Sequence, residues 1–138
     1  MKKISLLLIT SLLITAVSCS KTAGDNNPVP GIVTSGTWHV SLFVNSGTDE
    51  TSSFSGYGFE FSASGTLTAT KGSVTKTGTW STGNSSNKLV IDLGPKDASN
   101  LPYGEISKNW KLISSSSTEI KLGDDNTSSN EYLTFTKN

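Results

Sequence analysis

The sequence predicts an all-β domain, arranged as an antiparallel up-and-down barrel of about eight strands. Short segments beyond position 36 alternate between apolar and polar residues, which is the pattern of half-buried strands. Gly, Asn, Asp and Ser clusters separate these segments at intervals of roughly a dozen residues, a spacing typical of sandwiches and barrels. Beyond the N-terminal leader, no window of helical length carries apolar residues at helical spacing.

The strands are expected where Thr, Val and aromatic residues alternate with polar ones. These segments are 38–44, 57–61, 66–70, 74–80, 89–93, 110–112, 120–122 and 133–135. Because the connections are short, each strand is expected to pair with the strand before it, and such a meander closes into a barrel that leaves no exposed edge. A β-sandwich is the alternative arrangement.

The alternation also assigns side chains to the two faces of the strands. In the first strand, Trp38, Val40, Leu42 and Val44 share the inward face. The longest interruption, between Pro95 and Ser107, is expected to hold a short helical turn or a lid over one end of the barrel.

The N-terminus predicts export and lipid anchoring. Lys2 and Lys3 precede an apolar run, Ile4–Val17, and small residues lead to Cys19, the only cysteine of the chain. The run is shorter than the roughly 20 residues that cross a bilayer as a helix. We therefore expect a signal peptide over 1–18 and a lipid on Cys19, which holds the protein to the membrane.

The chain then divides into two parts. Residues 19–34 are rich in Gly, Asn and Pro and predict a flexible tether, and 35–138 form the barrel domain. These features predict an outer-membrane lipoprotein of the cell envelope, and they leave open which side of that membrane the domain faces.

Several short motifs together resemble a known family. Gly36-Thr37-Trp38 at the start of an eight-strand meander resembles the lipocalin and wider calycin pattern. The chain from Gly36 onward is similar to small lipocalin-like lipoproteins of Bacteroidota, through Gly58–Phe61, Gly78–Trp80 and Leu133–Lys137. The resemblance implies that Trp38 plugs the closed end of the barrel against a basic residue, here Lys137 or Lys121.

Composition excludes several functions. All eleven basic residues are Lys and none forms a cluster, whereas nucleic-acid recognition relies on Arg, so no nucleic-acid partner is expected. The only histidine, His39, lies on the predicted outer face, and no cysteine follows Cys19. Asp124-Asp125-Asn126 and Asp49-Glu50 lack the spacing of a calcium loop. We expect no catalytic residues, no metal, no cofactor and no enzymatic activity.

The inward aromatic residues are the best candidates for ligand binding. An eight-strand barrel is wide enough either to be filled by side chains or to hold one small ligand. Because the inward face carries almost no charge, the predicted ligand is small and apolar. The candidate ligand-binding residues are Trp38, Tyr57, Phe59, Trp80 and Trp110.

Two alternatives stay open. If these rings only fill the core, the protein is a structural or protein-interaction lipoprotein that engages an envelope partner through its exterior. The residues expected to form that exterior patch are Phe43, Phe54, Val90, Ile113 and Tyr132. The other alternative is a carbohydrate-binding surface module, in which exposed Trp or Tyr rings stack on sugars. This alternative requires at least one Trp at the surface.

Lipid anchoring can be tested by replacing Cys19 with Ala. The protein should then leave the membrane fraction, because stable anchoring depends on two or more acyl chains. Fractionation followed by intact-mass measurement checks this, with wild-type protein heavier than the chain cleaved before Cys19. A Cys19→Ala protein that stays membrane-bound and a wild-type protein without added mass would contradict it.

Overall fold

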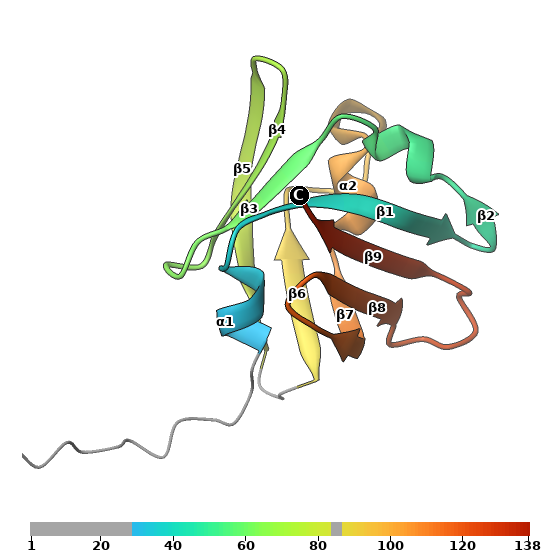
Figure 1. Cartoon of the computed structure of the whole chain (residues 1–138). Helices are drawn as coiled ribbons and strands as arrows, with labels where there is room; N and C mark the ends of the chain where they lie inside the picture. The colour runs from blue at the N-terminus through green and yellow to red at the C-terminus, as the bar shows by residue number, and fades with distance from the viewer. Residues whose placement is uncertain (1–28, 84–86) are drawn as a thin grey trace, which may run out of the picture.

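Each strand of the barrel pairs with the next along the chain, and the last strand returns to the first (Figure 1). This computed structural model describes residues 29–83 and 87–138. The strands are β1 (Thr37–Asn45), β2 (Thr48–Asp49), β3 (Gly58–Phe61), β4 (Thr66–Lys71), β5 (Val74–Ser81), β6 (Lys88–Asp92), β7 (Asn109–Ser115), β8 (Glu119–Asp124) and β9 (Tyr132–Lys137). The all-β barrel prediction is confirmed, with β2 as an additional short strand on β1. The signal peptide, Cys19 and residues 20–28 lie outside the described residues.

Closure depends on the antiparallel pairing of β1 with β9. Trp38 at the start of β1 lies opposite Lys137, and Val44 near its end lies opposite Tyr132. On its other side, β1 pairs with β3 only at Thr37 and Trp38, so the two strands separate beyond that point. The C-terminal strand therefore holds β1 in the sheet along most of its length.

A β-bulge in β1 reverses part of the predicted face assignment. The register against β9 shifts between Val40 and Leu42, so that one extra residue, Ser41, is accommodated. Phe43 is consequently buried, at 1% exposure, and Leu42 is 37% exposed. The predictions that Phe43 points outward and that Leu42 and Val44 point inward were wrong, because simple alternation does not reveal an inserted residue.

Phe54 was also predicted to lie outside, and it is buried. It belongs to the 3₁₀ turn η1 (Thr51–Phe54) and packs edge-on against Phe43, with ring centroids 5.2 Å apart. The Thr51 hydroxyl accepts a hydrogen bond of 2.8 Å from the backbone N–H of Phe43. The turn η1 therefore covers the part of β1 that β3 leaves unpaired.

A short helix, α1 (Val29–Val33), lies at the end of the barrel where β1 begins (Figure 1). Val29 and Val33 are both buried, and the Trp38 indole N–H donates a 2.8 Å hydrogen bond to the Val33 carbonyl. The sequence predicted that residues 29–33 belong to a flexible tether. They form a helix instead, because two valines four positions apart reach the core. The Lys137 ammonium lies 5.9 Å from the Trp38 ring centroid, the contact that the family resemblance implied.

The opposite end of the barrel is covered by η1 and by the segment between β6 and β7. That segment contains the 3₁₀ turn η2 (Ala98–Asn100) and the helix α2 (Tyr103–Ile106), which confirms the predicted helical turn. Ile106 is buried, and its carbonyl accepts a 2.9 Å hydrogen bond from the Trp110 indole. Tyr103 packs edge-on against Tyr57 across this end, at 5.5 Å.

Aromatic side chains fill the interior between these two ends. Phe59 and Phe61 of β3 both contact Phe135 of β9, at centroid distances of 5.3 and 5.6 Å. All three rings are at most 1% exposed. In the part of the chain that the structure describes, no helix has the length and apolar character to cross a membrane.

Because side chains fill the core, truncating Phe59 is expected to reduce the stability of the fold strongly. Phe59→Ala should lower the free energy of unfolding by about 3 to 5 kcal/mol, because it removes a fully buried ring and leaves a cavity. Val74→Ala is the matched control, since Val74 is 60% exposed, and should change it by less than about 0.5 kcal/mol. Urea unfolding measures both, and equal effects would contradict a packed core.

Candidate functional site

The five residues predicted to bind a ligand belong to the packed core. Trp38, Phe59 and Trp110 are fully buried and Trp80 is 8% exposed, while Tyr57 is half-buried. The Trp80 indole donates a 2.8 Å hydrogen bond to the Ser62 carbonyl, so each of the three indole N–H groups has a backbone partner. None of the five lines a pocket described below, and no tryptophan is exposed for stacking on a sugar.

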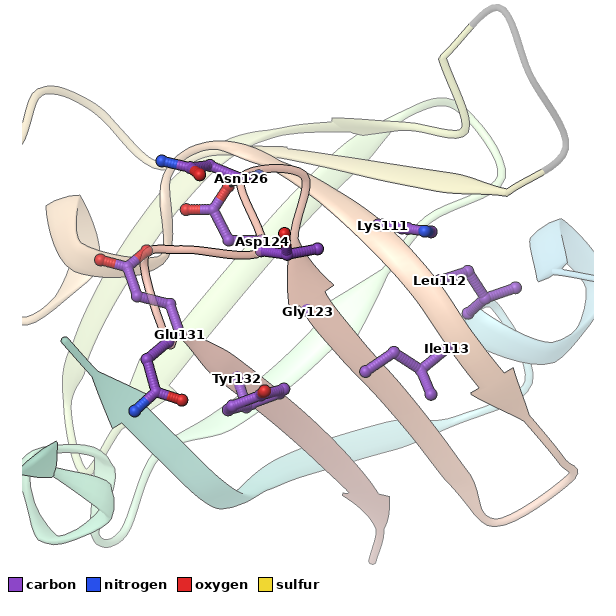
Figure 2. Close-up of a pocket in the computed structure, with 10 residues that line it drawn as sticks. Lys111, Leu112, Ile113, Gly123, Asp124, Asn126, Glu131 and Tyr132 are labelled. Atoms are coloured by element: carbon purple, nitrogen blue, oxygen red, sulfur yellow. Dashed lines mark hydrogen bonds between the residues drawn. The ribbon is translucent and has the colours of Figure 1, made fainter. Parts of the chain in front are cut away.

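A groove lies on the outer wall of the barrel, away from the core (Figure 2). Its centre is Gly123 of β8, which lies between Lys111 of β7 and Tyr132 of β9 in the sheet. Because Gly123 has no side chain, the neighbouring side chains border a hollow of about 320 Å³. We call this hollow the outer groove. Its lining residues are Lys111, Leu112, Ile113, Gly123, Asp124, Asn126, Thr127, Asn130, Glu131 and Tyr132.

Two exposed apolar side chains form opposite walls of the outer groove. Figure 2 shows Ile113 on one side of Gly123 and Tyr132 on the other. A Cβ atom placed on Gly123 would lie 3.2 Å from Ile113 Cδ1 and 3.8 Å from Tyr132 Cδ1. A side chain at position 123 would therefore contact both walls, and with glycine there the backbone forms the floor between them.

A second β-bulge places Ile113 on this wall. Leu112 lies opposite Leu122 and Ser114 opposite Lys121, which makes Ile113 the inserted residue of β7. The side chain of Ile113 is 57% exposed. The sequence predicted that Ile113 and Tyr132 lie outside the barrel, which is confirmed, and they meet in one groove. The role of Gly123 was missed, because an alternating pattern gives no weight to a residue without a side chain.

Further apolar residues continue from the outer groove along the barrel wall. Val44 lies opposite Tyr132 in the pairing of β1 with β9, so both side chains lie on the same face. Leu42, displaced outward by the first bulge, is exposed two positions earlier. Leu42, Ile113 and Tyr132 are thus three exposed large apolar residues on this wall.

At the polar end of the outer groove, acidic side chains form ion pairs with lysines. The Lys108 ammonium forms ion pairs with Glu131 and, at 3.2 Å, with Asp124. Lys88 pairs with the neighbouring Asp125. Burial opposes the charge of Lys108, but the two carboxylates outweigh it and raise the pKa of Lys108. One lysine cannot balance two carboxylates, but Lys111 also lines the groove, so Lys108 and Lys111 match Asp124 and Glu131 in number. This balance favours an apolar over a cationic occupant.

Asp124 is held ionised by its surroundings. The backbone N–H of Asn126 donates a 3.0 Å hydrogen bond to Asp124 Oδ1, and this bond, helped by Lys108, lowers the pKa of Asp124 from 3.8 to about 2. The same bond orders the first turn of the loop that follows β8. A backbone hydrogen bond of 3.1 Å from Asp124 N–H to the Glu131 carbonyl closes the loop.

Metal binding finds no support in the described residues. Within residues 29–83 and 87–138, no group of three or more His, Cys, Asp or Glu side chains is placed to hold a metal ion. His39 Nδ1 lies 2.6 Å from the Asn138 side-chain oxygen, near the start of β1.

Comparison with known proteins identifies the fold. The chain is similar in structure to a DUF4847 family protein from Bacteroides vulgatus, with a TM-score of 0.59 and 22% identity over 80% of this chain and 97% of the other. It is also similar to a lipocalin-like protein from Bacteroides uniformis, with a TM-score of 0.55 and 19% identity over 76% and 98%.

The fold is that of a lipocalin-like barrel. The resemblance to lipocalin-like proteins of these bacteria is therefore confirmed for the fold. The sequence matches no protein-family model and no curated protein.

The lowered pKa of Asp124 predicts a defined response to acid. Because the folded pKa of Asp124 lies below its ordinary value, its stabilising effect is complete above about pH 4 and is lost as pH falls towards 2. Asp124→Asn should lower the free energy of unfolding at pH 7 by about 1 kcal/mol, a figure reduced for solvent screening. Its stability should also depend less on pH in that window.

Urea unfolding at a series of pH values measures this difference. Asp92→Asn is a suitable control, since Asp92 is exposed on β6 and forms no ion pair among the described residues. Parallel pH profiles for wild type and Asp124→Asn would contradict the prediction.

Proposed function

We propose that this protein is a lipid-anchored module of the cell envelope that binds a partner protein through the outer groove. The observation that carries the proposal is the arrangement of Ile113, Gly123 and Tyr132, which border a hollow of about 320 Å³ between two exposed apolar walls. Exposed apolar surface of this kind marks interaction sites on soluble domains. The occupant that fits is an apolar side chain of the partner.

Because side chains fill the interior of the barrel, a binding site on its outer wall is favoured over one inside it. Among the candidate ligand-binding residues, Phe59 packs on Tyr57 and on Phe135. The three tryptophans donate their indole N–H groups to backbone carbonyls. A ligand inside the barrel would have to displace buried aromatic side chains. Binding on the outer wall leaves this packing unchanged, since the outer face of a strand does not contribute to the core.

Lipid attachment at Cys19 would orient the domain. Val29 lies ten positions after Cys19, so the chain places α1 at most about 35 Å from the lipid. The polar end of the outer groove lies near the other end of β1, where the backbone N–H of Gly47 bonds to the Asn130 carbonyl at 3.0 Å. Anchoring through α1 thus leaves this part of the groove accessible to a partner.

A crosslinking experiment tests the partner site. A photoreactive amino acid at position 132 should give an adduct of one defined mass in intact cells, and the same group at Thr79, exposed on β5, should not. Gly123→Val should reduce the adduct roughly tenfold by filling the hollow. Gly123 does not need a left-handed backbone conformation, and the atom nearest to an added Cβ is the end of the Ile113 side chain, which can move, so the variant should fold.

Thr79→Val in the protein that carries the photoreactive group at position 132 is the matched control, and it should leave the adduct unchanged. Equal adducts at positions 79 and 132, or an adduct at 132 that Gly123→Val does not reduce, would overturn the proposal. Circular dichroism and thermal unfolding show whether each variant is folded.

A small apolar ligand is the second candidate function, and one observation favours it. The volume of about 320 Å³ lies at the lower end of the range of small-molecule sites. The lipocalin-like neighbour supports ligand binding as a general expectation for this barrel. Such a ligand would change the amide resonances of residues around Gly123 rather than those of core residues around Phe59, which NMR titration with fatty acids would distinguish.

A further inference from the structure

A second pocket lies at the end of the barrel opposite α1, and we call it the rim pocket. It has a volume of about 250 Å³ and lies between η1 and the segment that leads into α2. Phe43 and Phe54 form its apolar floor, and Leu101 lies at its edge with 54% of its side chain exposed. The buried floor separates the rim pocket from the packed interior, so it is a site on the surface of the barrel end.

One side-chain amide brings two carboxylates together in the rim pocket. Asn45 Nδ2 donates hydrogen bonds to Glu50 Oε2 at 3.3 Å and to Glu105 Oε2 at 3.2 Å. The two oxygens therefore lie within about twice a hydrogen-bond length of each other, where like charges repel unless a cation is close. The three residues come from β1, the start of η1 and α2, so only the folded chain brings them together.

Only one of the two carboxylates has a cation beside it. The Lys96 ammonium lies 2.7 Å from Glu105 Oε2, and the Lys96 side chain is 53% exposed. Among the described residues, Glu50 forms no ion pair. The rim pocket consequently combines an apolar floor with one uncompensated negative charge, whereas the carboxylates of the outer groove are neutralised by lysines.

We propose that the rim pocket binds a small organic cation, a primary alkylammonium with a short apolar chain. The ammonium would donate charge-assisted hydrogen bonds to Glu50 and Glu105, the type of contact that Lys96 already makes with Glu105. The alkyl chain would lie against Leu101, which is 54% exposed, and this contact removes apolar surface of both from water. This site does not depend on the partner protein proposed for the outer groove.

The test compares three probes of similar shape and different charge. n-Pentylammonium should change the NMR resonances of the Asn45 side-chain amide and of the Leu101 methyl groups. Neutral 1-pentanol and anionic pentanoate should bind at least roughly tenfold more weakly, because they lack the charge-assisted contacts. Resonances around Gly123 should stay unchanged, which separates this site from the outer groove.

Glu50→Gln keeps the size of the side chain and removes its charge, and it should weaken n-pentylammonium binding roughly tenfold. Glu60→Gln, at an exposed site on β3, is the matched control and should leave binding unchanged. Thermal unfolding of both variants shows that they are folded. Equal binding of the three probes, an unchanged affinity in Glu50→Gln, or resonance changes confined to another surface would overturn the proposal.

Discussion

The pairing of β1 with β9 is the constraint on which the rest of this structure depends. A meander of strands has two exposed edges, and here the first and last strands satisfy each other's backbone hydrogen bonds. Closure fixes which side of every strand faces inward, so the aromatic rings of β3 and β9 meet in one core. It also brings Trp38 and Lys137, at opposite ends of the domain sequence, into contact beside α1.

Sequence reasoning could predict the parts of the fold that depend on regular alternation. Trp38, Phe59 and Phe135 point inward as expected, because each lies in a strand segment without an interruption. It failed where one residue is inserted. Ser41 shifts the register of β1, and Phe43 is turned into the core by a bulge that no local pattern marks. Phe54 was missed for another reason, since it lies in a 3₁₀ turn whose burial depends on the gap between β1 and β3.

The candidate sites were harder to predict than the fold because each is assembled from separate segments. Ile113 and Tyr132 were expected outside the barrel, but the groove between them depends on a bulge in β7 and on the missing side chain of Gly123. The rim pocket depends on Asn45, which bonds to two glutamates that are far apart in the sequence. The large aromatic residues were predicted to bind a ligand, and in the structure they form the packed core.

The bulge in β7 has an evolutionary consequence. Removing the single residue at position 113 would restore regular pairing between β7 and β8 without altering Trp110 or Leu122, both of which point inward. A one-residue insertion or deletion can therefore create or erase one wall of the groove while the barrel is inherited intact. Two barrels with the same core can then differ in the shape of this outer wall, through a change in strand length alone.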